Sequence, residues 1–218
     1  MIAAGRVTVN ALPATAGQVV NPATDEVRFD GELVHSPPQR TYLLLNKPVG
    51  VLSSVGDVRG RATVVDGLPA ETGRVFPVGR LDLDSRGLIL LTDDGELASR
   101  LMHPRYHVEK EYVVAVSGHP EAQSLRRLAE GMVVKGESFS PVTVRVLEAG
   151  PSQSRVCMVL KEGKRREIRR LWKALGHRVL DLQRVRLDGL QLGDLPEGRW
   201  RRLETAEVVA VRTAAGLG

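Results

Sequence analysis

The sequence is poor in cysteine and has no long apolar run. Its 218 residues include a single cysteine, Cys157, which therefore cannot form an internal disulfide. The neighbours of Cys157 are mostly apolar, which predicts a small buried side chain. No stretch reaches the roughly 18–20 apolar residues that a membrane-spanning helix needs. We therefore expect a cytoplasmic protein that does not act at a membrane.

The sequence also lacks the common signatures of metal and cofactor sites. Its five histidines show no ligand spacing such as HExxH, which disfavours a zinc site. No glycine pattern of a phosphate-binding or dinucleotide-binding loop is present, and no G-x-S-x-G motif surrounds a serine. Common nucleotide cofactors and serine-hydrolase chemistry are therefore disfavoured.

Acidic residues are outnumbered in one part of an otherwise balanced chain. The net charge is +5 and the isoelectric point is about 9.7. Residues 161–202 hold 13 Lys/Arg and 6 Asp/Glu, a net charge of +7, so the remainder of the chain sums to −2. A basic segment in a nearly neutral body indicates a polyanionic partner, with nucleic acid the first candidate.

Two parts of unequal size are expected. Residues 1–36 contain two short strand-like segments, 6–10 and 26–31, and too few apolar residues for an independent core. Prolines at 37–38 stop regular structure and predict a linker. The main body, assigned to 37–218, begins with a buried strand after Thr41.

Strand patterns dominate the main body. Helices are expected over 96–102 and 120–130, the first capped by Asp93 or Asp94. The expected strands are 42–45, 88–91, 109–116, 132–134, 142–146, 156–160 and 178–187. In the last of these, Leu180 and Leu182 share one face. Because several strands follow one another without strict βαβ alternation, we predict an α+β fold with a mixed, largely antiparallel sheet and flanking helices.

The clearest helix is expected over 164–175. Its apolar stripe consists of Ile168, Leu171, Trp172 and Leu175, at the spacing i, i+3, i+4 and i+7. Arg165 and Arg169 border this stripe on one edge. The cations further round towards solvent are Arg166, Arg170 and Lys173. The helix is therefore expected to present one pair of cations to the core margin and another set to solvent.

The stretch from Gly79 to Leu88 is dense in charge just before the chain becomes fully apolar. Charges near a core are costly unless they are paired. A solvated turn is one interpretation. In the other, Asp82 is a carboxylate at the mouth of a cleft, kept ionised by an arginine and available as a nucleophile. Arg169 is the candidate partner, and Tyr112 offers an aromatic body with a polar tip.

Each of these candidates has a plainer interpretation. Asp82 and Arg169 could form an ordinary ion pair, and Tyr112 could be a cross-strand packing residue. Ile168 and Leu182 could be core residues and no more. The residue types alone leave these alternatives open.

Three separated stretches resemble one family: residues 42–50, 78–95 and 162–170, with the segments 101–105 and 109–112 in agreement. Their order is similar to that in the RsuA/RluB branch of pseudouridine synthases. The third stretch resembles the large-subunit RluB type more than the small-subunit RsuA type. Residues 1–36 resemble only the latter part of an S4 RNA-binding domain, so we expect a truncated, partial S4-like module there.

The resemblance implies the pseudouridine synthase fold and the isomerisation of a uridine in ribosomal RNA, 23S rather than small-subunit RNA, by a monomer without metal or organic cofactor. Asp82 matches the catalytic nucleophile, Tyr112 the tyrosine that stacks on the base, and Arg169 the basic residue paired with the aspartate. Ile168 and Leu182 match the apolar walls of the base pocket. The residues expected to contact RNA are Arg80, Lys47, Lys164, Arg165, Arg166 and Arg170.

Two other functions fit parts of this pattern. A ribosome assembly factor with a vestigial site would share the basic segment but would not need Asp82, Tyr112 and Arg169 together. A metal-dependent phosphotransferase could use Asp82 and Asp84 as ligands of a hard cation. No third carboxylate follows at suitable spacing, apart from a pair at 93–94 that helix capping explains.

Overall fold

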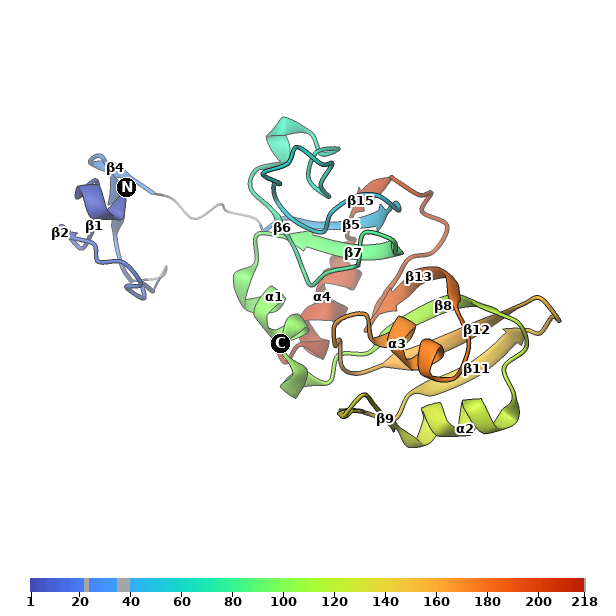
Figure 1. Cartoon of the computed structure of the whole chain (residues 1–218). Helices are drawn as coiled ribbons and strands as arrows, with labels where there is room; N and C mark the ends of the chain where they lie inside the picture. Colours follow the sequence, from blue (N-terminus) through green and yellow to red (C-terminus); the bar gives the residue numbers. More distant parts are fainter. Residues whose placement is uncertain (22–23, 35–39, 218) are drawn as a thin grey trace. The chain divides into compact units, whose positions relative to one another are not determined.

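The computed structural model describes residues 1–21, 24–34 and 40–217. The chain divides into two compact units, Met1–Arg40 and Thr41–Gly218 (Figure 1). The predicted boundary between residues 36 and 37 lies outside the described residues. In the part of the chain that is described, no helix is long and apolar enough to cross a membrane.

The first unit is a small antiparallel sheet with the strand order β2-β1-β3-β4. Its elements are η1 (Ile2–Ala4), β1 (Val7–Val9), β2 (Leu12–Pro13), β3 (Val27–Phe29) and β4 (Glu32–Leu33). The two strands predicted here are confirmed by β1 and β3. Among the described residues of this unit, only Val9 is a buried apolar side chain, so the unit has little core of its own. Its likeness to an S4 domain stays a prediction.

The second unit is built on a nine-stranded sheet with the main order β11-β12-β8-β13-β7-β5-β15. The strands of this unit are β5 (Tyr42–Lys47), β6 (Phe76–Pro77), β7 (Arg86–Thr92), β8 (Lys110–Ser117), β9 (Met132–Val134), β10 (Glu137–Phe139), β11 (Thr143–Glu148), β12 (Gln153–Leu160), β13 (Val179–Leu187), β14 (Leu190–Gln191) and β15 (Trp200–Arg202), of which β9 and β10 form a separate hairpin. Strands β7 and β13 pair in parallel, and the other named strands of the sheet pair antiparallel. The predicted mixed, largely antiparallel sheet is confirmed.

Helices flank this sheet (Figure 1). They are α1 (Gly95–Met102), α2 (Ala122–Glu130), α3 (Glu167–Ala174) and α4 (Thr205–Ala214), with short 3-10 turns η2 (Ala70–Thr72) and η3 (Pro104–Tyr106). Leu97 of α1 and Val211 of α4 share an apolar cluster with Leu88 and Leu90 of β7. Ile89 belongs to a different cluster, on the other face of β7. Burial on both faces explains why this strand is apolar without alternation.

Helix α3 begins later than predicted, whereas α1 and α2 confirm the helices expected near 96–102 and 120–130. It starts at Glu167 because Arg166 has a left-handed backbone (φ 53°), which an α-helix does not accept. The Lys164 N–H donates to the Glu167 side chain (2.9 Å). Residues 164–166 therefore form a turn, and helical spacing does not decide where Arg165 points.

Strand β13 departs twice from regular alternation. Its pairing with β8 shifts between Val179 and Asp181 and again between Arg184 and Arg186, as at β-bulges. Leu180, predicted to share the face of buried Leu182, is 42% exposed because of the first shift. Regular alternation would put Arg184 and Arg186 on one face. The second shift separates them, and Arg184 is only 2% exposed.

Candidate active site

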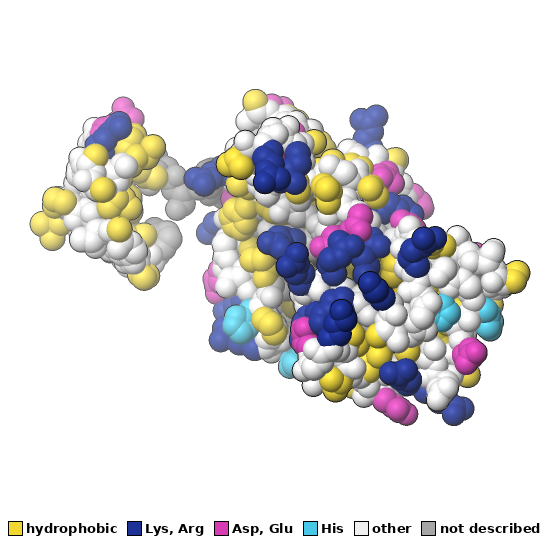
Figure 2. Space-filling view, in the orientation of Figure 1, with side chains coloured by type: hydrophobic (Ala, Val, Ile, Leu, Met, Phe, Trp, Pro, Cys, Tyr) yellow, Lys and Arg dark blue, Asp and Glu magenta, His cyan; other side chains and the backbone are white. Residues whose placement is uncertain are grey.

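A cleft of about 350 Å³ lies where the turn before β7 meets β8 and the start of α3. The predicted site residues that line it are Arg80, Asp82, Tyr112, Lys164, Arg165, Arg166, Ile168, Arg169 and Leu182. Figure 2 shows Lys and Arg side chains gathered over the middle of this unit, beside α3. The fold thus brings together residues that are up to 102 positions apart, from Arg80 to Leu182, and leaves Lys47 and Arg170 outside the lining.

Asp82 lies on a turn that backbone hydrogen bonds hold in place. The Ser85 N–H donates to the Asp82 carbonyl (3.0 Å), and Ser53 Oγ bonds both the N–H and the carbonyl of Leu81 at 3.0 Å. Gly79 enters the turn with a φ of 76°, where a side chain would be strained. These bonds fix the main chain of the turn, and the Asp82 side chain is 35% exposed, so its carboxylate is accessible from the cleft.

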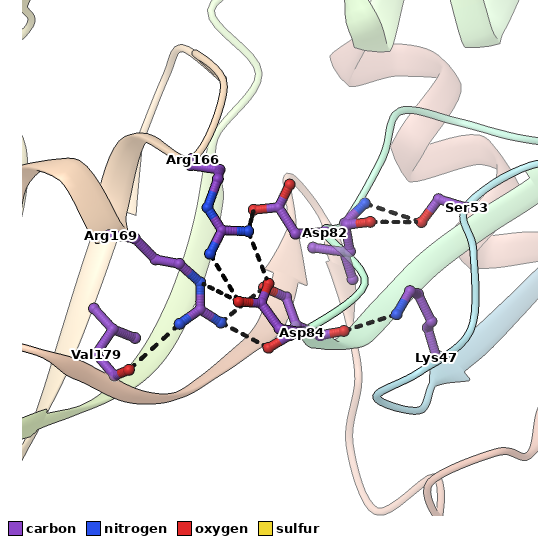
Figure 3. A network of polar contacts seen from close by, with 9 residues as sticks. Lys47, Ser53, Asp82, Asp84, Arg166, Arg169 and Val179 are labelled. Carbon is purple, nitrogen blue, oxygen red and sulfur yellow. Dashed lines mark hydrogen bonds and ion pairs between the residues drawn. The ribbon is translucent and has the colours of Figure 1, made fainter.

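Lys47 supports this turn from inside the protein (Figure 3). It is fully buried, and its Nζ donates to the carbonyls of Ser85 and Pro48, both at 2.8 Å. Burial lowers the pKa of Lys47 to about 8, against the opposing effect of the Asp82 and Asp84 carboxylates. Lys47 lines neither the cleft nor its rim, and two carbonyls occupy its Nζ, so this placement does not support the prediction that Lys47 contacts RNA.

The arginines beside the turn are paired differently from the prediction (Figure 3). Arg169 Nη2 donates to the Asp84 carbonyl (2.6 Å), and its Nε lies 3.3 Å from the Asp84 carboxylate. Arg166 lies 2.8 Å from Asp84 Oδ2 and 3.7 Å from Asp82 Oδ2. The expected pair of Asp82 with Arg169 is therefore wrong. Arg169 reaches across to the Val179 carbonyl as well (3.4 Å), and this anchoring to main chain at two points holds its guanidinium beside Asp84.

Asp84 is the main ion-pair partner of the two arginines at this turn. Hydrogen bonding from Arg166 lowers the pKa of Asp84 below its ordinary value, so this carboxylate is ionised and occupied. Asp82 is contacted more weakly, and no hydrogen bond to its carboxylate is found within the described residues. In the same part of the chain, no three His, Cys, Asp or Glu side chains come together as a possible metal site.

Tyr112, Ile168 and Leu182 supply the aromatic and apolar walls of the cleft. Ile168 and Leu182 are 4% and 6% exposed, and Tyr112 packs against the cluster to which they belong. Burial raises the pKa of Tyr112 above its ordinary value, while the nearby Arg184 guanidinium opposes that rise. The phenol is therefore neutral near pH 7, and it offers the cleft a flat face and a hydroxyl.

The cations predicted to contact RNA divide into two groups. Arg80, Lys164, Arg165 and Arg166 line the cleft. Arg165 is exposed and has no ion pair among the residues that the structure describes. Arg170 is occupied elsewhere, since its Nη2 lies 2.6 Å from Glu137 and its guanidinium stacks 4.8 Å from the centre of the Phe139 ring. The expectation that Arg170 binds RNA is not supported by this placement.

Two buried charged residues of this region were not predicted. Glu167 is 4% exposed, and burial together with the nearby Glu162 carboxylate raises its pKa to about 7. Arg184 donates from Nε to the Leu88 carbonyl (2.7 Å). The sequence signal for Glu167 was its acidic side chain near the start of the helix expected over 164–175. The signal for Arg184 was its position two residues after Leu182, on the same face of a strand whose pairing with β8 is regular from Asp181 to Arg184.

Residues 41–174 match the family described as RNA pseudouridylate synthase. The chain belongs to this family. It is an RNA pseudouridine synthase, and therefore an isomerase, as predicted. The turn that carries Asp82, β8 and the whole of α3 lie within the matched residues.

Individual relatives agree with this assignment over nearly the full chain. The chain is 36% identical to the ribosomal large subunit pseudouridine synthase B of Bacillus subtilis, covering 100% of this chain and 90% of that protein. It is also 36% identical to an uncharacterized RNA pseudouridine synthase of Aquifex aeolicus, covering 100% of this chain and 88% of the other. A crystal structure of a pseudouridylate synthase, 30% identical, superposes with a TM-score of 0.75 over 96% of this chain and 90% of that one. The predicted fold is confirmed.

Proposed function

We propose that this chain converts one uridine of large-subunit ribosomal RNA to pseudouridine, in the cytoplasm and as a monomer, with Asp82 as the nucleophile. The observation that carries the proposal is the cleft itself, in which an accessible carboxylate stands among Tyr112, Ile168 and Leu182. The choice of large-subunit RNA is supported by the name of the Bacillus subtilis relative. Residues 1–36 are proposed to be a partial S4-like module.

The reaction is an isomerisation and needs no co-reactant. The bond between the ribose C1′ and the base N1 breaks, the base turns, and C1′ bonds to C5. The proton on C5 leaves, and N1 gains a proton, so atoms and charge balance. A uridine within folded RNA has to leave its stack to reach the cleft, and a stacking face with apolar walls receives such a base.

Asp82 acts at the ribose C1′, by direct attack or by starting an elimination. Its carboxylate lines the cleft, and Arg166 lies 3.7 Å from Oδ2. Tyr112 stacks on the base, and its hydroxyl assists proton transfer. Arg80, Lys164 and Arg165 contact phosphates, which adds affinity and orientation without choosing a sequence.

The decisive experiment replaces Asp82 by asparagine. Asp82→Asn should fold and bind ribosomal RNA like the wild type, but should form pseudouridine at least about 10³-fold more slowly, since the nucleophile is lost. The measurement is tritium release from transcripts that carry 5-tritiated uridine. Asp84→Asn is the matched control, because it removes a carboxylate from the same turn and should retain measurable turnover.

Two outcomes would contradict the proposal. Tritium release by Asp82→Asn at the wild-type rate would remove Asp82 from the chemistry. Wild-type protein that binds ribosomal RNA but modifies none of it would favour the vestigial assembly factor instead. Mapping of pseudouridines in ribosomal RNA from cells that lack this protein would identify the target uridine and its subunit.

A further inference from the structure

A second cavity, of about 460 Å³, lies next to the Asp82 cleft. Tyr112, Arg80 and Lys164 line both cavities, so the two share a wall. An RNA strand with one base in the first cavity would therefore bring an adjacent nucleotide to the second cavity. The proposed reaction assigns no role to this space.

One side of the second cavity comes from two strands in register. On β8, Lys110 and Tyr112 are two positions apart and share a face. On β13, Arg184 stands opposite Tyr112, and Leu187 opposite Lys110. The bulge between Arg184 and Arg186 makes this possible, because regular alternation would not put residues three positions apart on one face.

The same bulge separates two arginine charges. Arg186 lies on the other face, where it bonds Glu111 at 2.8 Å and Glu109 at 3.1 Å. Arg184 is buried and uses Nε to bond the Leu88 carbonyl. Its guanidinium is close to the Tyr112 hydroxyl, but its Nη2 meets no acceptor at hydrogen-bond geometry among the described residues. A buried N–H of a cation without an acceptor is costly, so an acceptor brought by a ligand would be favourable.

The lining of this cavity carries an excess of positive charge. Its cations are Arg80, Lys110, Lys161, Lys164 and Arg184, and its carboxylate is Glu162. Glu162 is already paired with Lys164 at 2.8 Å, so it offsets little of the remaining positive charge. Burial lowers the pKa of Lys110, and the neighbouring Arg184 lowers it further. Lys110 Nζ donates to the Val108 carbonyl (2.9 Å) and keeps two further N–H donors, so an anion near Lys110 and Arg184 would be favourable.

The rest of the lining is apolar. Val78, Leu101, Met102 and Leu187 contribute to it. Cations next to an apolar wall suit a nucleotide, whose phosphate is charged and whose base is flat and largely apolar. We propose that this cavity holds the nucleotide adjacent to the target uridine, with its phosphate on Lys110 and Arg184 and its base against the apolar wall. The inference rests on the proposed function, because that nucleotide belongs to the same RNA.

Met102 allows a test that leaves the catalytic residues unchanged. It is 48% exposed at the last position of α1, so its replacement changes the rim of the cavity without opening the core. Met102→Glu and Met102→Gln have side chains of similar length and differ in charge. On a ribosomal RNA fragment that the wild type modifies, Met102→Glu should raise KM roughly three- to tenfold over Met102→Gln, because a carboxylate repels the phosphate. Val209→Glu, at a 58% exposed position of α4, adds the same charge elsewhere and should behave like the wild type.

Neutral linkages in the RNA identify the phosphate concerned. Methylphosphonates are introduced one at a time around the target uridine, and the difference in KM between Met102→Glu and Met102→Gln should vanish at one linkage beside it. Equal KM values for the two variants, or a difference that survives every neutral linkage, would overturn the inference while the proposed function stands. If the wild type modifies no ribosomal RNA transcript, the proposed function fails and this inference fails with it.

Discussion

Glu167 is the residue of the cleft whose charge depends most on pH near neutrality. It lies at the first position of α3, where a negative charge is favoured by the helix dipole. Burial outweighs that effect and raises its pKa from 4.5 to about 7. The folded protein therefore binds more protons at Glu167 than the unfolded chain does between these two pH values, and its stability falls as the pH rises through this window.

Glu167→Gln should remove that dependence, because an amide has a similar shape and does not ionise. At pH 8 the variant should be more stable than the wild type by up to about 3 kcal/mol, and near pH 4.5 the two should be alike. Urea unfolding at pH 4.5, 6 and 8 measures the difference. A gap between variant and wild type that stays constant over this range would show that Glu167 does not titrate as described.

Arg169 is a structural support of the turn as well as a charge in the cleft. Arg169→Ala leaves the carbonyls of Asp84 and Val179 without their partner and Asp84 with one cation fewer. We expect a loss of about 2–4 kcal/mol in unfolding free energy and a lower kcat, because the turn that carries Asp82 loosens. Thermal melting and turnover measure the two effects.

Arg165 provides the comparison for Arg169. It is exposed at the same cleft, so Arg165→Ala should change stability by less than about 0.5 kcal/mol and act mainly on KM. Equal stability of the two alanine variants would mean that Arg169 does not stabilise the turn and is only a surface cation.

At the scale of elements, the site depends on the junction of β7 and β13. These strands pair over the short register Gln183–Arg86 and Arg184–Gly87. Gly87 has a φ of 109°, and a Cβ there would lie 2.3 Å from the Arg184 carbonyl oxygen. The junction is therefore possible only with a glycine at this position.

Gly87→Ala should destabilise the protein by more than about 2 kcal/mol, because strain in φ and the backbone clash act together. Denaturant unfolding is the measurement. Gly95→Ala is the control, since Gly95 lies in α1 with open space around its Cα, and alanine there should be neutral or slightly stabilising. Similar effects at both positions would argue against the tight junction.

At the scale of the whole chain, charge and core both reside in the second unit. Residues 1–40 hold three Lys/Arg and four Asp/Glu, so they contribute −1 to a chain of net charge +5. The first unit also has a single buried apolar side chain among its described residues, Val9. Neither its charge nor its core suggests that the catalytic unit depends on it.

A fragment of residues 41–218 should therefore unfold cooperatively, with a melting temperature close to that of the catalytic unit in the full chain. Its KM for ribosomal RNA should stay within about threefold of the full-length value if the cleft cations supply most of the affinity, as proposed. Calorimetry and steady-state assays of the fragment measure both. A large rise in KM would instead show that the first unit is an effective RNA-binding module.

Local order was readable from the sequence because it follows from local chemistry. The apolar run 88–91 predicted a buried strand, and the alternating segments predicted a largely antiparallel sheet. Asp93 or Asp94 was expected to cap α1, and Asp94 does so. The family resemblance singled out Asp82, Tyr112 and Arg169, and the structure places all three at one cleft. These features depend on residue type and spacing, which are properties of the amino-acid sequence itself.

Pairing partners were decided only by the tertiary structure. The left-handed Arg166 shortened α3, main-chain carbonyls drew Arg169 to Asp84, and burial turned Lys47 from an expected RNA contact into a support of the turn. The second bulge of β13 turned Arg186 away from the face on which Arg184 lies. Each of these outcomes depends on atoms far apart in sequence that compete for the same space and hydrogen bonds, and no local pattern records which of them prevails.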